Sequence, residues 1–397
     1  MRASYGWLKT LVPGLVATPA ELGARLTAAG IAVDTIHEIG AASPKCVVAE
    51  VLSFEPHPKQ VSGKSGLRLV KVRHGSGEQV VVCGAPNVPG PGGLVILAPL
   101  GVHLPAKGMT IERRTIAGVA SEGMLCSESE LGLSEDHEGI LILPPGSARP
   151  GQALSEVFPE AHDHVYEIDL TPNRPDCLGH VGLAREICAL YKIPFAWPSH
   201  PTAATGRDTL ASLGLRIEVL EPSRNPRYGA ALVRGVTIAP SPLGTKWRLG
   251  ALGVRAISNV VDVTNLMMLL WGHPMHAFDL ERVRDKRIVV RKAKDGEVMK
   301  TLDGVDRTLV ADDLLICEGA GEGRPTALAG VMGGADSEIA ATTRDVLFEC
   351  AYFDPRGVRR TARRHGMHTE SSHRFERGVD PNDVAQVLDR AVALTTT

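Results

Sequence analysis

From about residue 40 to residue 151 the chain consists of short β-branched runs separated by Gly and Pro turns, and this pattern restricts the fold more than any other. The runs are KCVVAEVLSF, GLRLVKVRH, EQVVVCGA, GGLVILAPL and MTIERRTIAG. Several short strands at regular spacing with turn signals between them are typical of an all-β barrel or sandwich. Five strands in one small segment favour a small closed barrel of the OB type. We therefore expect an inserted OB-fold β-barrel over residues 40–151.

The segments on either side of this region predict a helix and strands that are too few to fold alone. Thr18 is a typical helix N-cap, Pro19 suits the first helical position, and Gly30 ends the helix before the strand IAVDTIHEI. Residues 165–191 predict a strand, a Pro-rich turn and a second helix. We expect residues 1–39 and 152–199 to form one small α/β domain that the barrel interrupts.

The remainder of the chain has the pattern of a mixed α+β domain. The stretch WPSHPTAATGRDTL at 197–210 reads as a linker. Beyond it, strand runs such as RIVVRKA, DLLIC and DVLFECAYF alternate with helical runs at 242–254, 262–271 and 381–394. The expected fold class is therefore an α+β multidomain protein, with a third module at residues 200–397.

Charge and cysteine usage set further limits. The formal net charge of the 397 residues is −2, so no global field attracts nucleic acid or an anionic membrane. The seven cysteines are odd in number, form no C-x-x-C pair, and lie mostly in apolar runs. This pattern predicts buried, reduced thiols and a reducing compartment. With no signal-peptide pattern and no apolar run near 18 residues, we expect a cytoplasmic protein without membrane contact.

A polar cluster brackets an apolar run in the segment RAISNVVDVTNLMMLLWGHPMHAFD, residues 255–279. Asparagine, threonine and histidine side chains stand at both ends of a short hydrophobic core segment. A plain core helix or a solvated strand has no need of this cluster. The segment therefore predicts one wall of a pocket with polar tips.

Several familiar catalytic patterns are missing from the sequence. The glycine-rich stretches GAGEG (319–323) and GVMGG (330–334) match neither a P-loop nor a dinucleotide fingerprint, and tight turns are the better interpretation. There is no G-x-S-x-G elbow, and no cysteine carries a signature of activation. If the third module hydrolyses a substrate, we expect water to be the nucleophile.

Histidine pairs raise the alternative of a metal site. His273 and His276, or His365 and His368, together with Glu349, have residue types and spacing that suit a metal. However, Pro274 disfavours a regular helix through His273. We therefore expect no metal, and interpret these histidines as hydrogen-bonded walls of a pocket.

Two basic clusters are candidates for contact with nucleic acid. The barrel region contains ten Lys/Arg and ten Asp/Glu, and its one aromatic residue is Phe54, so it lacks a platform on which bases stack. Its basic cluster, including Lys59 and Lys64, is either a modest phosphate contact or, as we favour, a solvated strand face. The segment PRGVRRTARRHGMH (355–368) has five arginines and no acid. We expect either that Arg359, Arg360 and Arg363 contact a polyanion, or that the arginines of this segment form interdomain ion pairs.

A set of motifs in the same order resembles one known family. They are SYGWL, CGAPNV (83–88), EGMLCSESELGL (122–133), LTPNRPDCLGHVGLARE (170–186), NVVDVTN (259–265), GHPMHAFD (272–279), AGVMGG (329–334), FECAYFDP (348–355) and SHRFERGVDP (372–381). With these motifs the chain resembles the N-terminal half of bacterial phenylalanyl-tRNA synthetase β subunits over its whole length. The family more usually has GQP where this chain has GHP.

The resemblance implies a role, partners and cofactors. The inserted barrel would be a tRNA-binding-like domain, and residues 200–397 would be the editing module that hydrolyses tyrosine wrongly attached to tRNA(Phe). The partners would be the synthetase α subunit, in an α2β2 enzyme, and tRNA(Phe). No cofactor is expected in this chain, while ATP and Mg²⁺ would serve aminoacylation in the complete α/β enzyme. A non-catalytic scaffold for tRNA contact and subunit assembly is the alternative.

The resemblance also implies the residues of the editing site. Glu349 would accept the tyrosyl hydroxyl, with pairing to a nearby arginine as the alternative. His276 and Asn265 would position the ester and the attacking water, and the Gly330 N–H would stabilise the oxyanion. Arg255 would hold the terminal phosphate or ribose, or brace the pocket. The remaining matching positions are Thr264, Pro274, Ala329, Thr369 and Ser371.

Overall fold

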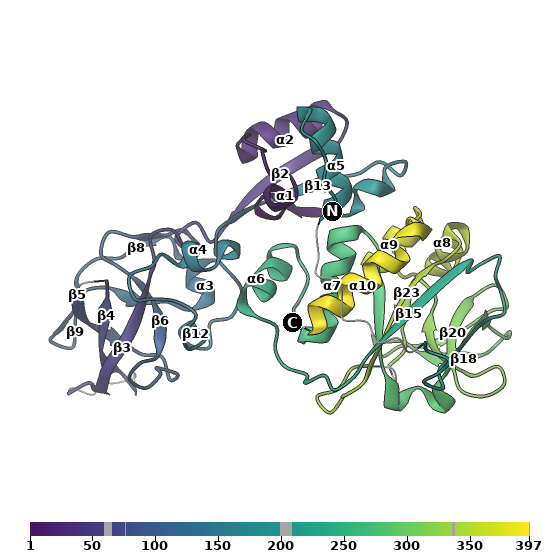
Figure 1. Cartoon of the computed structure of the whole chain (residues 1–397). Helices are drawn as coiled ribbons and strands as arrows, with labels where there is room; N and C mark the ends of the chain where they lie inside the picture. Colours follow the sequence, from purple (N-terminus) through teal and green to yellow (C-terminus); the bar gives the residue numbers. More distant parts are fainter. Residues whose placement is uncertain (59–65, 76, 199–208, 336–337, 397) are drawn as a thin grey trace.

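The computed structural model describes residues 1–58, 66–75, 77–198, 209–335 and 338–396. Figure 1 shows a β-rich unit, a small α/β unit and a larger α+β module, each with its own packed interior. The mixed α+β multidomain class expected from the sequence is confirmed. Lys59, Lys64 and most of the expected linker, at 199–208, lie outside the described residues.

The small α/β unit is built from both ends of the interrupted segment. Its antiparallel sheet has the order β1-β13-β2, so strands far apart in the sequence pair directly. Its helices bury Leu8, Leu22 and Leu183 against this sheet. The elements are β1 (Arg2–Ser4), α1 (Tyr5–Leu11), α2 (Pro19–Ala28), β2 (Ala32–Ile39), β13 (Asp163–Asp169), η3 (Pro175–Leu178) and α5 (His180–Tyr191).

The helix predicted after Thr18 is present with the expected ends. The Thr18 hydroxyl accepts from the backbone N–H of Glu21, and the Glu21 carboxylate accepts from the N–H of Thr18. This reciprocal capping box satisfies two backbone donors that the helix itself leaves unpaired. Pro19 stands at the first position of α2, and Gly30 follows its end with φ +89°.

The β-rich unit is organised around one curled antiparallel sheet. Its order is β11-β6-β3-β4-β5, and β12 pairs with β6. Strand β6 is buried on both sides: Val95 and Leu97 face one apolar cluster, while Leu94 and Ile96 face another. The elements are β3 (Val47–Pro56), β4 (Arg68–His74), β5 (Gly77–Cys83), β6 (Leu94–Ala98), β7 (His103–Leu104), η1 (Pro105–Lys107), β8 (Met109–Thr110), β9 (Arg114–Ile116), β10 (Val119–Ser121), β11 (Met124–Leu125), α3 (Glu128–Leu131), β12 (Ile142–Leu143), α4 (Leu154–Val157) and η2 (Pro159–Ala161).

Strand pairing among the described residues does not close this sheet into a barrel. Near the open edges, the backbone N–H of Glu122 donates to Val80 O at 3.5 Å, and the N–H of Val82 donates to the Ser121 hydroxyl at 3.1 Å. These contacts bring β5 toward the segment around β10 without forming a ladder. The expected OB barrel and the three domain boundaries therefore stay predictions.

The third module packs two sheets against each other. One has the order β14-β17-β20-β21-β22 and the other β15-β23-β16. The elements are β14 (Arg216–Val219), β15 (Arg227–Val233), α6 (Leu243–Ala251), α7 (Asn259–Trp271), β16 (Met275–Asp279), η4 (Leu280–Arg282), η5 (Arg284–Lys286), β17 (Arg287–Lys292), β18 (Val298–Lys300), β19 (Asp306–Thr308), β20 (Leu314–Glu318), β21 (Arg324–Leu328), β22 (Met332–Gly333), β23 (Val346–Tyr352), α8 (Pro355–Arg364), α9 (Glu370–Phe375), η6 (Pro381–Asp383) and α10 (Val384–Thr396).

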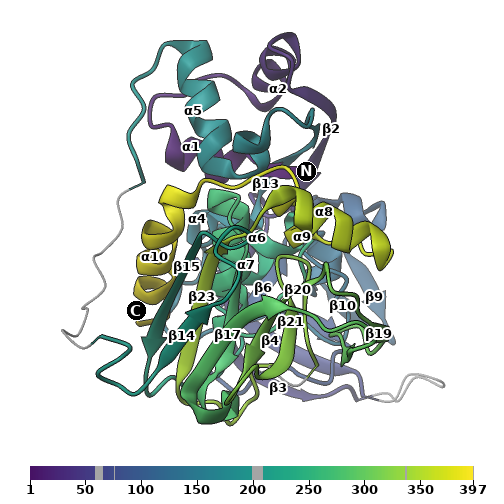
Figure 2. The same ribbon diagram turned by 90° about the vertical axis from the view of Figure 1, so that its right-hand side faces the viewer.

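The sheet β15-β23-β16 is buried on both faces. Side chains of Phe348 and Cys350 join the apolar cluster of α7 and α10, which lie along this sheet in Figure 2. Leu347 and Ala351 point the other way, into the cluster shared with the second sheet. Since successive residues of a strand face opposite sides, every side chain of β23 except Tyr352 is buried.

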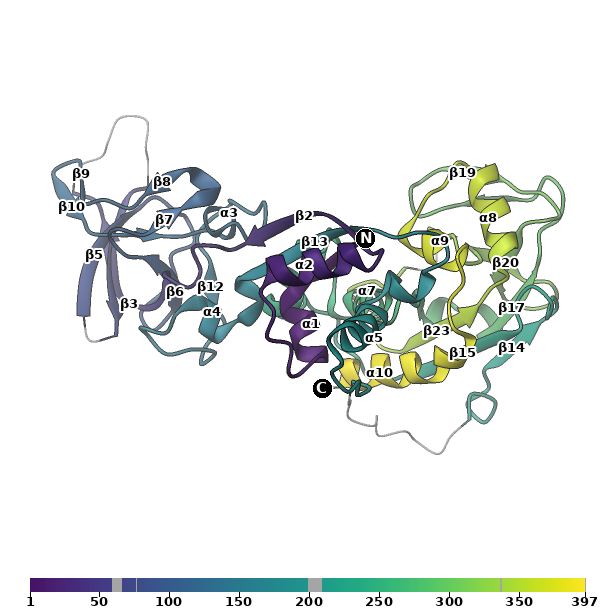
Figure 3. The ribbon, with the colours of Figure 1, turned by 90° about the horizontal axis from the view of Figure 1, so that it is seen from above.

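The module is joined to the other two units by buried contacts. Trp247 of α6 is 1% exposed and packs into the β-rich unit, with its ring 5.4 Å from that of Phe158. His180 of α5 accepts from Ser4 N–H at 3.0 Å and donates to Leu269 O at 2.7 Å. A β-carbon at Gly179 would lie 2.3 Å from Gly272 N, so this close approach requires glycine. Figure 3 shows the α/β unit lying between the other two.

Two further expectations concern thiols and membranes. All seven cysteines are buried and free, which confirms the expected burial of the thiols. No helix in the described part of the chain has the length and apolar character needed to span a membrane.

The insertion of Trp247 into the β-rich unit gives a stability prediction. Trp247→Ala should lower the free energy of unfolding by about 3–5 kcal/mol, because it removes a fully buried ring and leaves a cavity. Trp197→Ala is the control, since Trp197 is 52% exposed, and it should cost much less. Denaturant unfolding followed by circular dichroism makes the comparison. Equal destabilisation by the two substitutions would show that α6 does not anchor the β-rich unit.

Candidate functional site

Glu349 is the centre of the candidate site because it is an ionisable side chain inside a buried strand. It lies on β23, the middle strand of β15-β23-β16, and is 5% exposed. Among the described residues it has no hydrogen bond and no ion pair, so the alternative of an arginine partner is not seen there. Burial raises its pKa from 4.5 to about 8, because a poorly solvated site disfavours the charged form. At neutral pH the carboxyl is therefore mostly protonated.

His276 lies directly beside this carboxyl. It is paired with Glu349 across β16 and β23, while Ala230 is the partner on β15. Directly opposite residues of an antiparallel pair project to the same face at about 4.5–5.5 Å between β-carbons. Burial lowers the pKa of His276 from 6.5 to about 4, so its imidazole is neutral at pH 7 and one ring nitrogen can accept a proton. The His276 ring also packs edge-on against Phe278.

The turn after β21 and the start of α9 form a second group of candidate residues. The Thr369 hydroxyl donates to Val331 O at 2.9 Å, and the Ser371 hydroxyl donates to Gly330 O at 3.1 Å. Thr369 is also the N-cap of α9, where its hydroxyl accepts from Ser372 N–H. These bonds hold the helix start on the turn that contains Ala329 and Gly330.

Gly330 occupies a position that only glycine fits. Its φ is +71°, and a β-carbon there would lie 3.0–3.2 Å from side-chain atoms of Val358, Phe353 and Phe375. The same turn leads into β22, where a β-carbon at Gly333 would lie 3.2 Å from the His276 ring. The second group of residues therefore approaches His276 through β22.

The remaining predicted site residues lie further from Glu349. The Thr264 hydroxyl donates to Val261 O at 2.7 Å within α7, and α7 packs on the sheet face opposite to Glu349. No hydrogen bond among the described residues joins Thr264 or Asn265 to Glu349. Pro274 is buried just before β16, and Arg255 is exposed in the loop between α6 and α7. The structure thus groups Glu349 with His276, and Ala329 and Gly330 with Thr369 and Ser371, but does not join Arg255, Thr264 or Asn265 to them.

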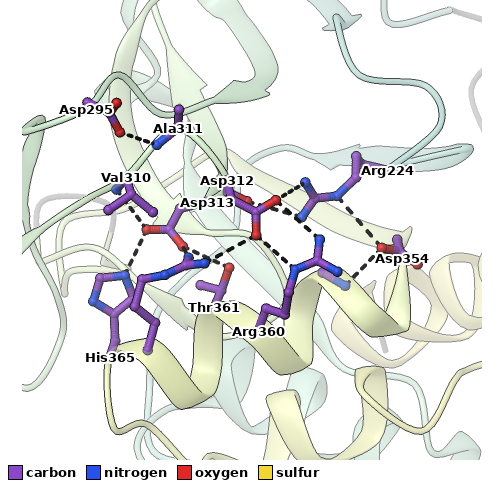
Figure 4. Close-up of polar contacts among 12 residues, drawn as sticks. Arg224, Asp295, Val310, Ala311, Asp312, Asp313, Asp354, Arg360, Thr361 and His365 are labelled. Carbon is purple, nitrogen blue, oxygen red and sulfur yellow. Dashed lines mark hydrogen bonds and ion pairs between the residues drawn. The ribbon is translucent and has the colours of Figure 1, made fainter.

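The arginines of α8 divide into two sets, and Figure 4 shows the paired set. Arg360 and Arg224 both bind Asp312, at 2.9 and 3.2 Å. The Arg360 contact holds the pKa of Asp312 down at about 2. Arg364 pairs with Asp312 and Asp313. These ion pairs lie within the module, so interdomain pairing is not their role.

The second set on α8 consists of Arg356, Arg359 and Arg363. All three are exposed, and none has an ion pair among the described residues. Spaced three and four residues apart, they lie on one side of the helix. We call them the α8 arginine stripe.

Two of the histidines considered as metal ligands form hydrogen bonds within the protein instead. His273 donates to Ala351 O at 2.9 Å, and His365 bonds Asp313 at 2.9 Å. Among the described residues, no three His, Cys, Asp or Glu side chains are grouped so as to hold a metal ion.

Comparisons with known proteins bear on the identity of the chain. Residues 224–397 match the family model described as "B3/4 domain", and residues 46–153 match the one described as "Putative tRNA binding domain". Three phenylalanine–tRNA ligase β subunits align with 99% of the chain: 44% identity for Syntrophus aciditrophicus, 47% for Anaeromyxobacter dehalogenans and 46% for Geobacter sulfurreducens. The chain belongs to the phenylalanine–tRNA ligase β-subunit family. It spans 47–48% of the length of these relatives and corresponds to their N-terminal half.

Sequence reasoning missed two residues that lie at this site. Tyr228 of β15 has a buried hydroxyl without a hydrogen-bond partner among the described residues. Gly333 borders His276. The motif AGVMGG marked the second position, but nothing in the sequence fixes the register between β15 and β23 that places Tyr228.

The shifted pKa of Glu349 predicts a pH dependence of stability. In the folded chain this carboxyl keeps its proton up to about pH 8, whereas the unfolded chain loses it near pH 4.5. Its contribution is therefore complete below pH 4.5 and is lost as the pH rises through 8. Glu349→Gln should gain stability relative to the native protein across this window, by up to about 1.4 kcal/mol per pH unit.

Urea unfolding at pH 4.5, 6, 7 and 8.5 measures this difference. Phe348→Leu, on the opposite face of the same strand, is the control, and its destabilisation should not change with pH. A difference between Glu349→Gln and the native protein that stays constant from pH 4.5 to 8.5 would contradict the raised pKa.

Proposed function

We propose that this chain carries the editing site of a phenylalanine–tRNA ligase, where tyrosine wrongly esterified to tRNA(Phe) is hydrolysed. One observation carries the proposal: a buried carboxyl, Glu349, has no partner among the described residues and lies beside a neutral histidine, His276. Leaving a buried polar group without a partner costs free energy. A substrate hydroxyl that bonds this group recovers that cost.

Selectivity follows from the single hydroxyl by which tyrosine and phenylalanine differ. An apolar synthetic pocket cannot strongly reject a ligand that merely adds a hydroxyl. A second pocket that requires the hydroxyl discriminates far better, because phenylalanine leaves the polar group unsatisfied. Glu349 can accept from the tyrosyl hydroxyl through its carbonyl oxygen when protonated, or through either oxygen when ionised.

The chemistry is hydrolysis of an ester by water. His276, neutral at pH 7, accepts a proton from the attacking water while the water oxygen bonds to the ester carbonyl carbon. The Gly330 N–H donates to the oxyanion that forms. The bond from the acyl carbon to the ribose oxygen then breaks, and that oxygen receives the proton. The products are tyrosine and free tRNA.

The other matching residues are proposed to position the substrate. Since α7 covers the sheet face opposite to Glu349, we propose that Asn265 and Thr264 orient the ester and water where the substrate passes the edge strand β16. Arg255 binds the terminal phosphate or ribose. Pro274 and Ala329 shape the pocket walls. Thr369 and Ser371 act through their bonds to Val331 O and Gly330 O, which hold the oxyanion turn in place.

For tRNA contact we propose the α8 arginine stripe, joined by the partly paired Arg360. Three exposed guanidinium groups without a partner among the described residues suit phosphate oxygens, which Arg binds in a bidentate manner. The role of Lys59 and Lys64 stays a prediction. The β-rich unit matches a family named for tRNA binding, but its ten Lys/Arg and ten Asp/Glu balance. We propose that this unit is an OB barrel, residues 40–151, whose own phosphate contacts are weak.

The rest of the assignment concerns the complete enzyme. We propose an α2β2 complex with the α subunit in the cytoplasm, in which ATP and Mg²⁺ act in aminoacylation outside this chain. In this account residues 1–39 with 152–199, and residues 200–397, are the other two domains.

One observation favours the alternative of a non-catalytic scaffold for tRNA contact and assembly. Cavities of about 360 and 700 Å³ are lined by residues other than Glu349 and His276. As a scaffold, the chain would bind tRNA without hydrolysing its ester. The deacylation experiment below distinguishes the scaffold from the editing enzyme.

Glu349→Ala and His276→Ala should have different effects on deacylation. Glu349→Ala should erase the preference for tyrosine. At neutral pH the carboxyl is mostly protonated, so the lost bond is a neutral one worth about 0.5–1.5 kcal/mol, or roughly 2- to 12-fold in discrimination. His276→Ala should slow hydrolysis of both esters, by roughly 10²- to 10⁴-fold if it serves as the base. Steady-state deacylation of tyrosyl- and phenylalanyl-tRNA(Phe) by the α/β enzyme measures both.

His103→Ala, at an exposed histidine of the β-rich unit, is the control and should leave both rates unchanged. If Glu349→Ala keeps the ratio of tyrosyl to phenylalanyl hydrolysis, the carboxyl does not read the hydroxyl. If the native enzyme binds tRNA but hydrolyses neither ester, the scaffold alternative holds instead.

The α8 arginine stripe predicts a change in the salt dependence of tRNA binding. Replacing Arg356, Arg359 and Arg363 with Gln should reduce the slope of log K against log salt by about 2–3, since each lost phosphate contact lowers it by about 0.7–0.9. The matched control replaces three exposed cations of the β-rich unit, Lys107, Arg114 and Arg149, with Gln. Fluorescence titration across KCl concentrations compares them, and a larger change in the control would place the contact on the β-rich unit.

A further inference from the structure

Tyr228 is the second polar group that the sheet buries beside the candidate site. It lies on β15, and its hydroxyl oxygen is buried with no hydrogen-bond partner among the described residues. Buried tyrosine hydroxyls usually find a partner. An unpaired one is a cost to stability, so its presence beside Glu349 requires an explanation.

The strand register places Tyr228 and Glu349 on one face. Ala230 pairs with Glu349, and Tyr228 pairs with Ala351, with no irregularity between these positions. Tyr228 and Ala230 are two residues apart, so both project to the face on which Glu349 and His276 lie. Tyr228 is thus the diagonal neighbour of Glu349, a spacing of about 7–8 Å that an aromatic side chain can bridge.

The two polar groups approach each other without forming a hydrogen bond. The Tyr228 pKa is raised well above its usual value, mainly by burial and further by the charge of Glu349. The residues directly across from each of them, Ala230 and Ala351, are small. A donor and an acceptor therefore lie on one face as diagonal neighbours, and neither satisfies the other.

We propose that Tyr228 is a further specificity-determining residue of the editing pocket, whose hydroxyl donates to the phenolic oxygen of the tyrosyl substrate while Glu349 accepts the proton of that same phenol. This inference rests on the proposed function and adds a second contact to it. A phenol is both a donor and an acceptor, so one substrate hydroxyl satisfies both protein groups. Phenylalanine satisfies neither, and each remains buried without a partner.

Tyr228→Phe in the α/β enzyme tests this role, because it removes one oxygen and keeps the ring. It should lower kcat/KM for tyrosyl-tRNA(Phe) by roughly 2- to 12-fold, the value of one neutral hydrogen bond. The kcat/KM for phenylalanyl-tRNA(Phe) should not fall. The loss should appear in KM rather than kcat, because the contact holds the substrate and takes no part in bond breaking.

Folding and coupling provide two further measurements. The thermal midpoint of Tyr228→Phe should be equal to or above that of the native enzyme, because the lost hydroxyl had no partner. In a double-mutant cycle with Glu349→Gln, the two losses in discrimination should be non-additive, since both groups read one substrate hydroxyl. Tyr352→Phe is the matched control, because Tyr352 lies in the same sheet but on the opposite face. Its ratio of kcat/KM for tyrosyl-tRNA(Phe) to kcat/KM for phenylalanyl-tRNA(Phe) should equal that of the native enzyme.

The outcomes separate this inference from the proposed function. If the native enzyme prefers tyrosyl-tRNA(Phe) and Tyr228→Phe keeps both that ratio and KM, Tyr228 is not a specificity residue and the editing function stands. If Tyr228→Phe lowers the kcat for hydrolysis of both esters equally, the residue is structural and the inference fails. If the native enzyme hydrolyses neither ester, the proposed function fails and the inference fails with it.

Discussion

Burial of one carboxyl in the middle of β23 is the constraint on which the site depends. Leu347 and Ala351 pack into one apolar cluster, and Phe348 and Cys350 into another, so the strand has no solvated face on which Glu349 could ionise freely. Its pKa therefore rises to about 8. A fold selected for stability alone would place an apolar residue here, since a buried group of this kind costs free energy unless a partner satisfies it. A ligand hydroxyl is the partner that we propose.

Connections within the fold extend from this strand to the other units. The register of β16 brings His276 to Glu349, and β22 brings the turn of Gly330 to His276. The start of α9 bonds to that turn, while Arg374 of the same helix donates to Leu178 O in the α/β unit at 3.2 Å. Arg374 is 1% exposed. The position of the Gly330 turn is thus tied to the α/β unit through one short helix.

Much of this architecture follows from local sequence rules. Thr18, Pro19 and Gly30 predict α2 correctly, because caps act within one helical turn. The β-branched runs predict β17, β20 and β23, and the motif resemblance indicates the family. Local rules do not predict the register between two strands. Tyr228 and Glu349 are neighbours only because Ala230 of β15 pairs with Glu349 of β23. The charge pattern was also insufficient to predict the partners of the α8 arginines. Arg360 and Arg364 pair with Asp312 and Asp313 of their own module rather than with another domain.

We propose that this chain separates two esters by one substrate hydroxyl, which Glu349 and Tyr228 bind inside the third module. Single-turnover hydrolysis of tyrosyl-tRNA(Phe) and phenylalanyl-tRNA(Phe) by the native α/β enzyme, at pH 7 and saturating enzyme, tests it most directly. We predict that the tyrosyl ester is hydrolysed at least about twofold faster, because the mostly protonated Glu349 carboxyl makes a neutral hydrogen bond worth about 0.5–1.5 kcal/mol. Equal rates for the two esters, or no hydrolysis above the rate in water, would contradict it.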